Sequence, residues 1–213
     1  MEPSVPEIHS FLHLSRALFF EFFGTALIVY AYNFTAASYM GRGFAYFIGW
    51  MIAVSISGAH FNPATTLAVY LAEGKYLRQI GRLKLYILVQ FAGCFMGIFF
   101  SWLVLKSPVM GYLMWPHIQD PSVAIWYFSE LGNIYYAKIV FLEILNTMTF
   151  LIIYLLVIYK PSLRTVDEII KGFGVSIALW ICYALSAGSG ACLNPALALA
   201  QTAYQVGFLN GLG

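Results

Sequence analysis

Two polar octets stand out in an otherwise apolar sequence. The first octet, SGAHFNPA, covers residues 57–64, and the second octet, SGACLNPA, covers residues 189–196. Six of the eight positions hold the same residue in both octets. Each octet places an asparagine before a proline, a pair that suits the N-cap and the first position of a helix. Because a helix N-terminus and a carboxamide both supply N–H donors, the pattern indicates recognition of a neutral oxygen atom.

A second set of matching positions indicates that the chain is internally duplicated. Glu21 and Thr25 recur as Glu143 and Thr147, at an offset of 122 residues (143 − 21). An ionisable residue inside an apolar segment is costly and normally has a partner, so we expect both glutamates to be hydrogen-bonded. A proton relay is the alternative, but no lysine or arginine stands opposite them and the acidic residues do not cluster.

The composition is that of a membrane protein. Of the 213 residues, 61% are hydrophobic and 9% charged, whereas about 25% are charged in a typical soluble domain. The formal net charge of +2 and the absence of a lysine-rich run argue against a nucleic-acid partner. Cys94, Cys182 and Cys192 show no paired spacing, so we expect no disulfide, no metal site and no cofactor.

Five apolar segments have about the roughly 20 residues that a membrane span needs. They cover residues 17–39, 41–57, 85–105, 136–159 and 169–185. Two shorter segments begin at Pro63 and Pro195, and each is expected to stop at a glycine, Gly74 or Gly207. At about 1.5 Å per residue these segments cross only half of the hydrocarbon layer.

The order of these segments predicts how the two halves are inserted. Three full spans lie between the start of the first span and the start of the fourth. Because this number is odd, the second half enters the membrane upside down. The two half-spans then meet N-terminus to N-terminus near the midplane, and each terminus carries about half a positive charge. Such a centre offers hydrogen-bond donors while its field opposes protons and cations. It therefore predicts a pore for small uncharged molecules.

Both octets and one further segment resemble the aquaporin, or major intrinsic protein, family. SGAHFNPAT and GSGACLNPA are similar to its two signature loops, and YILVQFAGCFMG holds the matching residues Tyr86, Gln90, Gly93 and Gly97. The resemblance covers roughly residues 17–206. It implies an all-α membrane protein with an aquaporin-like inverted repeat, built from full transmembrane helices plus two re-entrant half-helices. After an N-terminal arm (1–16), the domain (17–213) would hold a first repeat at about 17–105 and an incomplete second repeat at about 136–213.

The resemblance also implies roles for individual residues. Asn62 and Asn194 would donate to the solute at the midplane. The residues that lock the half-helices together would be Pro63, Ala64, Pro195 and Ala196. Four residues would brace the loops beside them: Glu21, Glu143, Gln90 and His60. His60 is expected to be hydrogen-bonded locally and to line the pore wall.

One departure from the family concerns the selectivity filter. An arginine usually follows the second signature loop directly, and this chain has Leu197 there. The other filter candidates are Phe44 on the second span and Cys182 on the fifth. A residue count from Asn62 without gaps leads instead to Arg42, which is the fourth candidate. If Arg42 reaches the lumen, it replaces the missing charge.

A second departure concerns the end of the repeat. The family has a sixth full span after the second signature loop, whereas this sequence ends at Gly213. We expect either a longer native polypeptide or a partner that supplies the missing wall.

Two functions follow from these features. The first is a passive membrane channel for water or a small neutral solute such as glycerol. The second is a non-conducting structural subunit of a larger membrane complex, favoured by Leu197, by the missing span and by the aromatic content of 15 Tyr, 18 Phe and 5 Trp. The expected partners are water or solute, the lipid bilayer, and either a homotetramer, usual in the family, or other subunits. No nucleophile, base and orienting group can be assembled, so no enzyme is expected.

The distribution of positive charge predicts the orientation in the membrane. Eight basic residues fall on one side: Arg16, Lys75, Arg78, Arg82, Lys84, Lys160, Arg164 and Lys171. Three fall on the other: Arg42, Lys106 and Lys138. The sequence therefore predicts a multi-pass integral membrane protein with its N-terminus on the cytoplasmic or equivalent side, without indicating which membrane.

Overall fold

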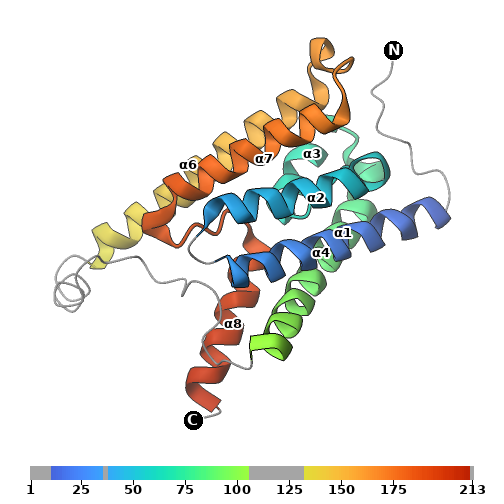
Figure 1. Ribbon diagram of the computed structural model, residues 1–213. Helices are drawn as coiled ribbons and strands as arrows, with labels where there is room; N and C mark the ends of the chain where they lie inside the picture. Colours follow the sequence, from blue (N-terminus) through green and yellow to red (C-terminus); the bar gives the residue numbers. More distant parts are fainter. Residues whose placement is uncertain (1–10, 36–37, 106–131, 212–213) are drawn as a thin grey trace.

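The computed structural model describes residues 11–35, 38–105 and 132–211, and most of these residues are helical (Figure 1). The α-helices are α1 (Phe11–Phe34), α2 (Tyr39–Ser57), α3 (Pro63–Glu73), α4 (Tyr76–Leu105), α6 (Gly132–Tyr159), α7 (Glu168–Leu185) and α8 (Pro195–Gly211). Two 3₁₀ turns, η1 (Pro161–Leu163) and η2 (Ala187–Ser189), flank α7. Within the described ranges no strand occurs, which confirms the all-α fold class.

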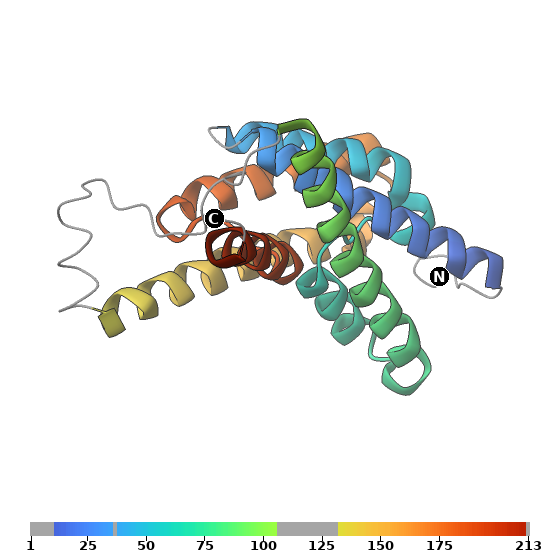
Figure 2. The same ribbon diagram turned by 90° about the horizontal axis from the view of Figure 1, so that it is seen from below.

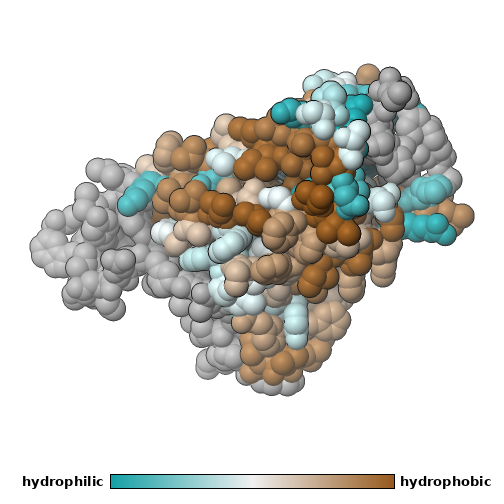
Figure 3. Space-filling view, turned by 45° about the horizontal axis from the view of Figure 1, so that its top comes forward, coloured by the Kyte–Doolittle hydropathy of each residue, from teal (hydrophilic) through white to brown (hydrophobic). Residues whose placement is uncertain are grey.

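Four of these helices, α1, α4, α6 and α7, are long and apolar enough to cross a membrane. The second expected span, residues 41–57, forms α2, a helix of 19 residues that is not among the four. Arg42, Tyr46 and Trp50 lower its hydropathy, and all three are buried in the bundle. Large apolar side chains are exposed along the outer faces of the helices (Figure 3), as expected of a chain that contacts lipid.

The long helices pack in the order α4, α1, α2, α7, α6. Figure 1 shows α1, α2 and α7 running side by side, with α4 crossing α1. The short helix α3 lies against α4 and α6 (Figure 2), and α8 lies against α4 and touches α3. The contact between α2 and α7 joins the first half of the chain to the second.

Two glycines of α4 allow its close contact with α1. A Cβ atom added at Gly93 would lie 2.4 Å from the carbonyl oxygen of Phe22, and one at Gly97 would lie 2.5 Å from that of Ala26. Both distances are far below any real carbon–oxygen contact, so only glycine fits. This contact places Gln90, one turn before Gly93, against α1.

One helix boundary agrees with the sequence expectation and two differ. As expected, the helix α3 ends before Gly74, which adopts a left-handed conformation with φ of 67°. Gly207, in contrast, is not among the described glycines with positive φ, and α8 continues through it to Gly211 for a total of 17 residues. The N-terminal arm is also shorter than expected, because residues 11–16 already belong to α1. The segment between the expected spans 85–105 and 136–159 lies mostly outside the described residues.

The α1–α4 contact predicts that Gly93→Ala destabilises the protein. The added methyl group meets the main chain of α1, and overpacking of this kind costs about 1–3 kcal/mol. Thermal unfolding in detergent should show a lower Tm for Gly93→Ala. Gly81→Ala on the same helix is the control, because nothing lies within 4 Å of a Cβ atom there, and it should leave Tm unchanged or slightly raised. Equal Tm values for the two variants would contradict the packing argument.

Candidate functional site

The two octets fold into loops of the same backbone conformation. Gly58 and Gly190 have φ of 92° and 98°, and the residues that follow them, Ala59 and Ala191, have φ of 55° and 54°. The fifth positions of the octets, Phe61 and Leu193, also have positive φ. A left-handed conformation is unfavourable for residues other than glycine. The same strained geometry therefore recurs at every equivalent position, as a duplicated structural element requires.

The asparagine of each octet caps its own helix and binds the opposite loop. The side-chain oxygen of Asn62 accepts from the main-chain N–H of Ala64 at 2.8 Å, and that of Asn194 accepts from the N–H of Ala196 at 3.0 Å. Through their Nδ2 atoms, Asn62 donates to the carbonyl of Leu193 at 2.8 Å and Asn194 donates to that of Phe61 at 3.0 Å. These reciprocal bonds hold the N-termini of α3 and α8 together. Pro63 at the start of α3 is buried, whereas Pro195 at the start of α8 is exposed.

Glu21 on α1 is fully buried and accepts four hydrogen bonds. Its Oε1 accepts from the hydroxyl of Ser57 at 2.7 Å and from the N–H of His60 at 2.9 Å. Its Oε2 accepts from the N–H of Phe61 at 2.7 Å and from the carboxamide of Gln90 at 2.8 Å. One carboxylate thus binds three donors of the first octet and one from α4.

Glu143 on α6 binds the second octet in the same way. Its Oε1 accepts from the hydroxyl of Ser189 and from the N–H of Cys192 at 3.2 Å, and its Oε2 accepts from the N–H of Leu193 at 2.8 Å. These donors are the first, fourth and fifth residues of the octet, as they are for Glu21. The two glutamates therefore satisfy the same buried main-chain groups in the two loops.

The two glutamates differ in what covers them. Gln90 of α4 lies over Glu21 and also donates to the hydroxyl of Thr66 at 2.8 Å. At the offset that relates the octets, 132 residues (189 − 57), the counterpart of Thr66 is Ala198. Glu143 instead lines an open groove of about 560 Å³ between α6 and α8, together with Thr147, Pro195, Ala198 and Thr202 among others.

Tyrosine hydroxyls bind the main-chain carbonyls of the loops, a contribution that the sequence did not reveal. The four bonds run from Tyr86 to Ser57 (3.1 Å), from Tyr154 to Gly58 (2.6 Å), from Tyr46 to Ala59 (2.8 Å) and from Tyr32 to Gly190 (3.1 Å). Of these tyrosines only Tyr86 was singled out, and it was singled out by the family resemblance. Part of the aromatic content that suggested external interfaces therefore lies in the core. The signal available in the sequence was the number of tyrosines inside apolar segments.

Three of the four filter candidates lie inside the bundle. Arg42, Leu197 and Cys182 each have at most 1% of their surface exposed. The guanidinium carbon of Arg42 lies 3.8 Å from the ring centroid of Tyr32, whose hydroxyl binds the second octet at Gly190. Arg42 is thus placed beside the loop that lacks the usual arginine.

Phe44 does not line the interior, contrary to expectation. Its side chain is 48% exposed, on the stripe of α2 that also exposes Met40, Ile48 and Met51. Residues two apart on a helix point about 200° apart, so Arg42 and Phe44 cannot both face inward. The buried stripe of α2 contains Arg42 and Tyr46.

His60 contacts residues of both halves. Its Nδ1 lies 3.2 Å from the hydroxyl of Thr66, and its ring lies edge-on to that of Tyr154 at 6.1 Å. Among the residues that the structure describes, no group of three or more His, Cys, Asp or Glu side chains suits a metal ion, and the three cysteines are unpaired thiols.

The bonds to Glu21 predict that Glu21→Gln destabilises the protein more than Glu143→Gln. A carboxamide turns an N–H₂ group toward at least one N–H or O–H donor, and an unsatisfied buried donor costs about 1–3 kcal/mol. Glu21 faces four donors and is fully buried, whereas Glu143 faces three and borders a groove. Unfolding in detergent, followed by circular dichroism, measures the two variants side by side, and an equal or reversed order would refute the argument.

Comparison with known protein families matches residues 7–208 to the major intrinsic protein family. A comparison with curated proteins finds no match. The family match spans both octets, both glutamates and all the described helices up to residue 208. On this match, and with the duplicated loops that meet between α3 and α8, the chain is an integral membrane protein that belongs to the major intrinsic protein family, whose members are channels for water or small solutes.

Proposed function

We propose that this chain is a passive channel in which a small neutral solute passes the junction of the two half-helices. The observation that carries the proposal is the reciprocal bonding of Asn62 and Asn194 at the facing N-termini of α3 and α8. A carboxamide has two N–H groups, and each cross-bond uses one. The second N–H of each asparagine supplies the donor for a solute oxygen, and both side chains keep a small exposed surface, 6% and 7%.

The positive field at this junction selects for neutral solutes. Two helix N-termini point at one another, and each carries about half a positive charge. A proton or metal cation at this point would also lose its hydration in a narrow, low-dielectric site. Water and small polyols such as glycerol carry oxygen acceptors without a charge and fit these donors.

We further propose that Arg42 serves as the charged residue of the filter. It stands on α2, not after the second octet, and it lies over Tyr32 beside Gly190. Leu197 and Cys182 form the apolar remainder of this level. The charge of the filter thus moves from the start of α8 to α2.

The proposal predicts that Asn194→Asp lowers water permeability. An aspartate keeps the oxygen that caps α8 but has no N–H for the solute or for the Phe61 carbonyl 3.0 Å away. Stopped-flow light scattering on proteoliposomes under an osmotic gradient measures the rate of shrinkage. Proteoliposomes with wild-type protein should shrink faster than protein-free liposomes. With Asn194→Asp, most of this difference in shrinkage rate should be lost. A variant that shrinks at the wild-type rate would contradict a role for this carboxamide.

The filter assignment predicts that Arg42→Leu alters selectivity, whereas Phe44→Leu does not. Arg42 is buried at the filter level, and Phe44 faces outward on the same helix. The ratio of glycerol to water permeability should change in Arg42→Leu and should be partly restored by adding Leu197→Arg. If Phe44→Leu changes the ratio as much as Arg42→Leu does, the filter does not lie on the inner stripe of α2.

A second function, that of a non-conducting structural subunit, is favoured by the groove between α6 and α8. There a carboxylate, Glu143, borders an open and mainly apolar surface, which is costly if lipid fills it. A neighbouring subunit that donates a hydrogen bond to Glu143 would remove that cost. Purification in mild detergent separates the two functions: a homotetramer active in the shrinkage assay supports the channel, and stable co-purification with larger membrane proteins, without permeability, supports the subunit.

A further inference from the structure

Four large aromatic side chains meet between the two halves of the molecule. Tyr46 and Trp50 come from α2, and Phe150 and Tyr154 come from α6. Each has at most 2% of its surface exposed. We call these four residues the aromatic cluster.

The aromatic cluster bridges two helices whose main chains pack elsewhere. The helix α2 packs on α1 and α7, and α6 packs on α7 and α3. The rings of Tyr46 and Phe150 meet edge-on at 5.9 Å, and those of Trp50 and Tyr154 meet edge-on at 6.0 Å. Side chains, not backbones, therefore fill the space between α2 and α6.

This space borders the first octet directly. The hydroxyl of Tyr46 binds the carbonyl of Ala59, and the hydroxyl of Tyr154 binds the carbonyl of Gly58. The ring of Tyr46 also lies edge-on to that of Phe61 at 5.7 Å. Two main-chain carbonyls of the first octet are therefore occupied by tyrosine hydroxyls of the aromatic cluster.

The aromatic cluster is continuous with the second octet and with the filter level. One buried apolar cluster contains the four rings, residues of both octets, and Cys182 of α7. Phe150 and Cys182 both belong to this buried cluster. The buried side chains thus reach from the first octet to the filter without exposed surface between them.

We infer that the aromatic cluster is the constriction that limits passage through this protein, with Phe150 as the side chain that must move. The inference rests on the proposed channel function. Phe150 is the member that has no polar atom to anchor it, whereas the two tyrosines are fixed by their hydrogen bonds to the loop. A dry apolar neck opposes water entry even without a complete steric block. Rotation of the Phe150 ring away from Tyr46 opens a path past the carbonyls of the first octet.

The test compares large-to-small variants of the full 213-residue chain in proteoliposomes. Proteoliposomes that contain Phe150→Ala should shrink about tenfold faster under an osmotic gradient than those that contain wild type, because the substitution removes the apolar neck. Phe150→Leu, which removes less volume and is milder toward folding, should give an intermediate rate. A second readout is the labelling of Cys182 by a membrane-impermeant methanethiosulfonate, located by mass spectrometry. Labelling should be faster in both variants than in wild type.

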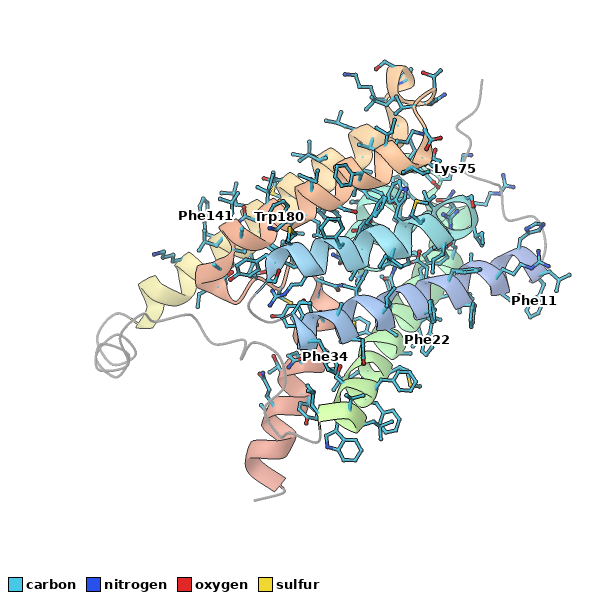
Figure 4. All side chains as sticks on the ribbon, in the orientation of Figure 1. Phe11, Phe22, Phe34, Lys75, Phe141 and Trp180 are labelled. Atoms are coloured by element: carbon cyan, nitrogen blue, oxygen red, sulfur yellow. The ribbon has the colours of Figure 1, made fainter. Side chains whose placement is uncertain are left out.

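Two matched controls isolate the effect of the ring. Ile98→Ala makes a cavity in the separate buried cluster between α1, α4 and α8, and it should not increase shrinkage. Phe141→Ala changes an exposed residue of the same helix that points away from the bundle (Figure 4) and should have no effect.

The outcomes separate the constriction from the channel itself. Unchanged shrinkage and unchanged Cys182 labelling in folded Phe150 variants would overturn the constriction, as would an equal increase in Ile98→Ala. Faster labelling with shrinkage that stays at the level of protein-free liposomes in every variant would support the constriction and refute the channel function. Faster shrinkage together with faster labelling supports both.

Discussion

The structure depends on satisfying the main-chain polar groups of two loops that turn back inside a membrane domain. Water cannot serve this purpose in the hydrocarbon layer, and each unsatisfied group costs several kcal/mol. Glu21 and Glu143 accept from the loop N–H groups, and tyrosine hydroxyls donate to the loop carbonyls. The glutamates are therefore held by the loops as much as the loops are held by them. A charged residue in this position is part of the fold and needs no role in proton transfer.

The duplication is close in the loops and incomplete around them. The backbone strain, the asparagine caps and the glutamate contacts repeat position by position. The cover does not, because Gln90 of α4, which is bonded to Thr66 of α3, covers the first glutamate, whereas the second borders a groove and has Ala198 in place of the threonine. The cover over the buried glutamate is thus complete in the first half and incomplete in the described residues of the second half.

The sequence was sufficient where a signal is local or repeated. The octets located both helix starts, since an N-cap and a following proline act within a few residues, and the repeated glutamates followed from their spacing. The tyrosine contacts were missed because their donors lie far away in the chain, with Tyr154 96 residues from Gly58. Phe44 was taken as a filter candidate on the second span, although helical phase puts it on the face opposite to Arg42. Gly207 was taken as a stop because glycine tolerates both helix and turn, and only the observed φ distinguishes them.

The crossed asparagine bonds also constrain how the protein is made. Asn62 needs the carbonyl of Leu193, and Asn194 needs the carbonyl of Phe61, so neither loop can complete its own bonding. A chain under synthesis has inserted its first three long helices well before residue 193 leaves the ribosome. Until then the carboxamide of Asn62 and the carbonyl of Phe61 lack these partners. Final closure of the domain is therefore a late event, and a chain interrupted before the second octet would present the translocon with an unfinished first half.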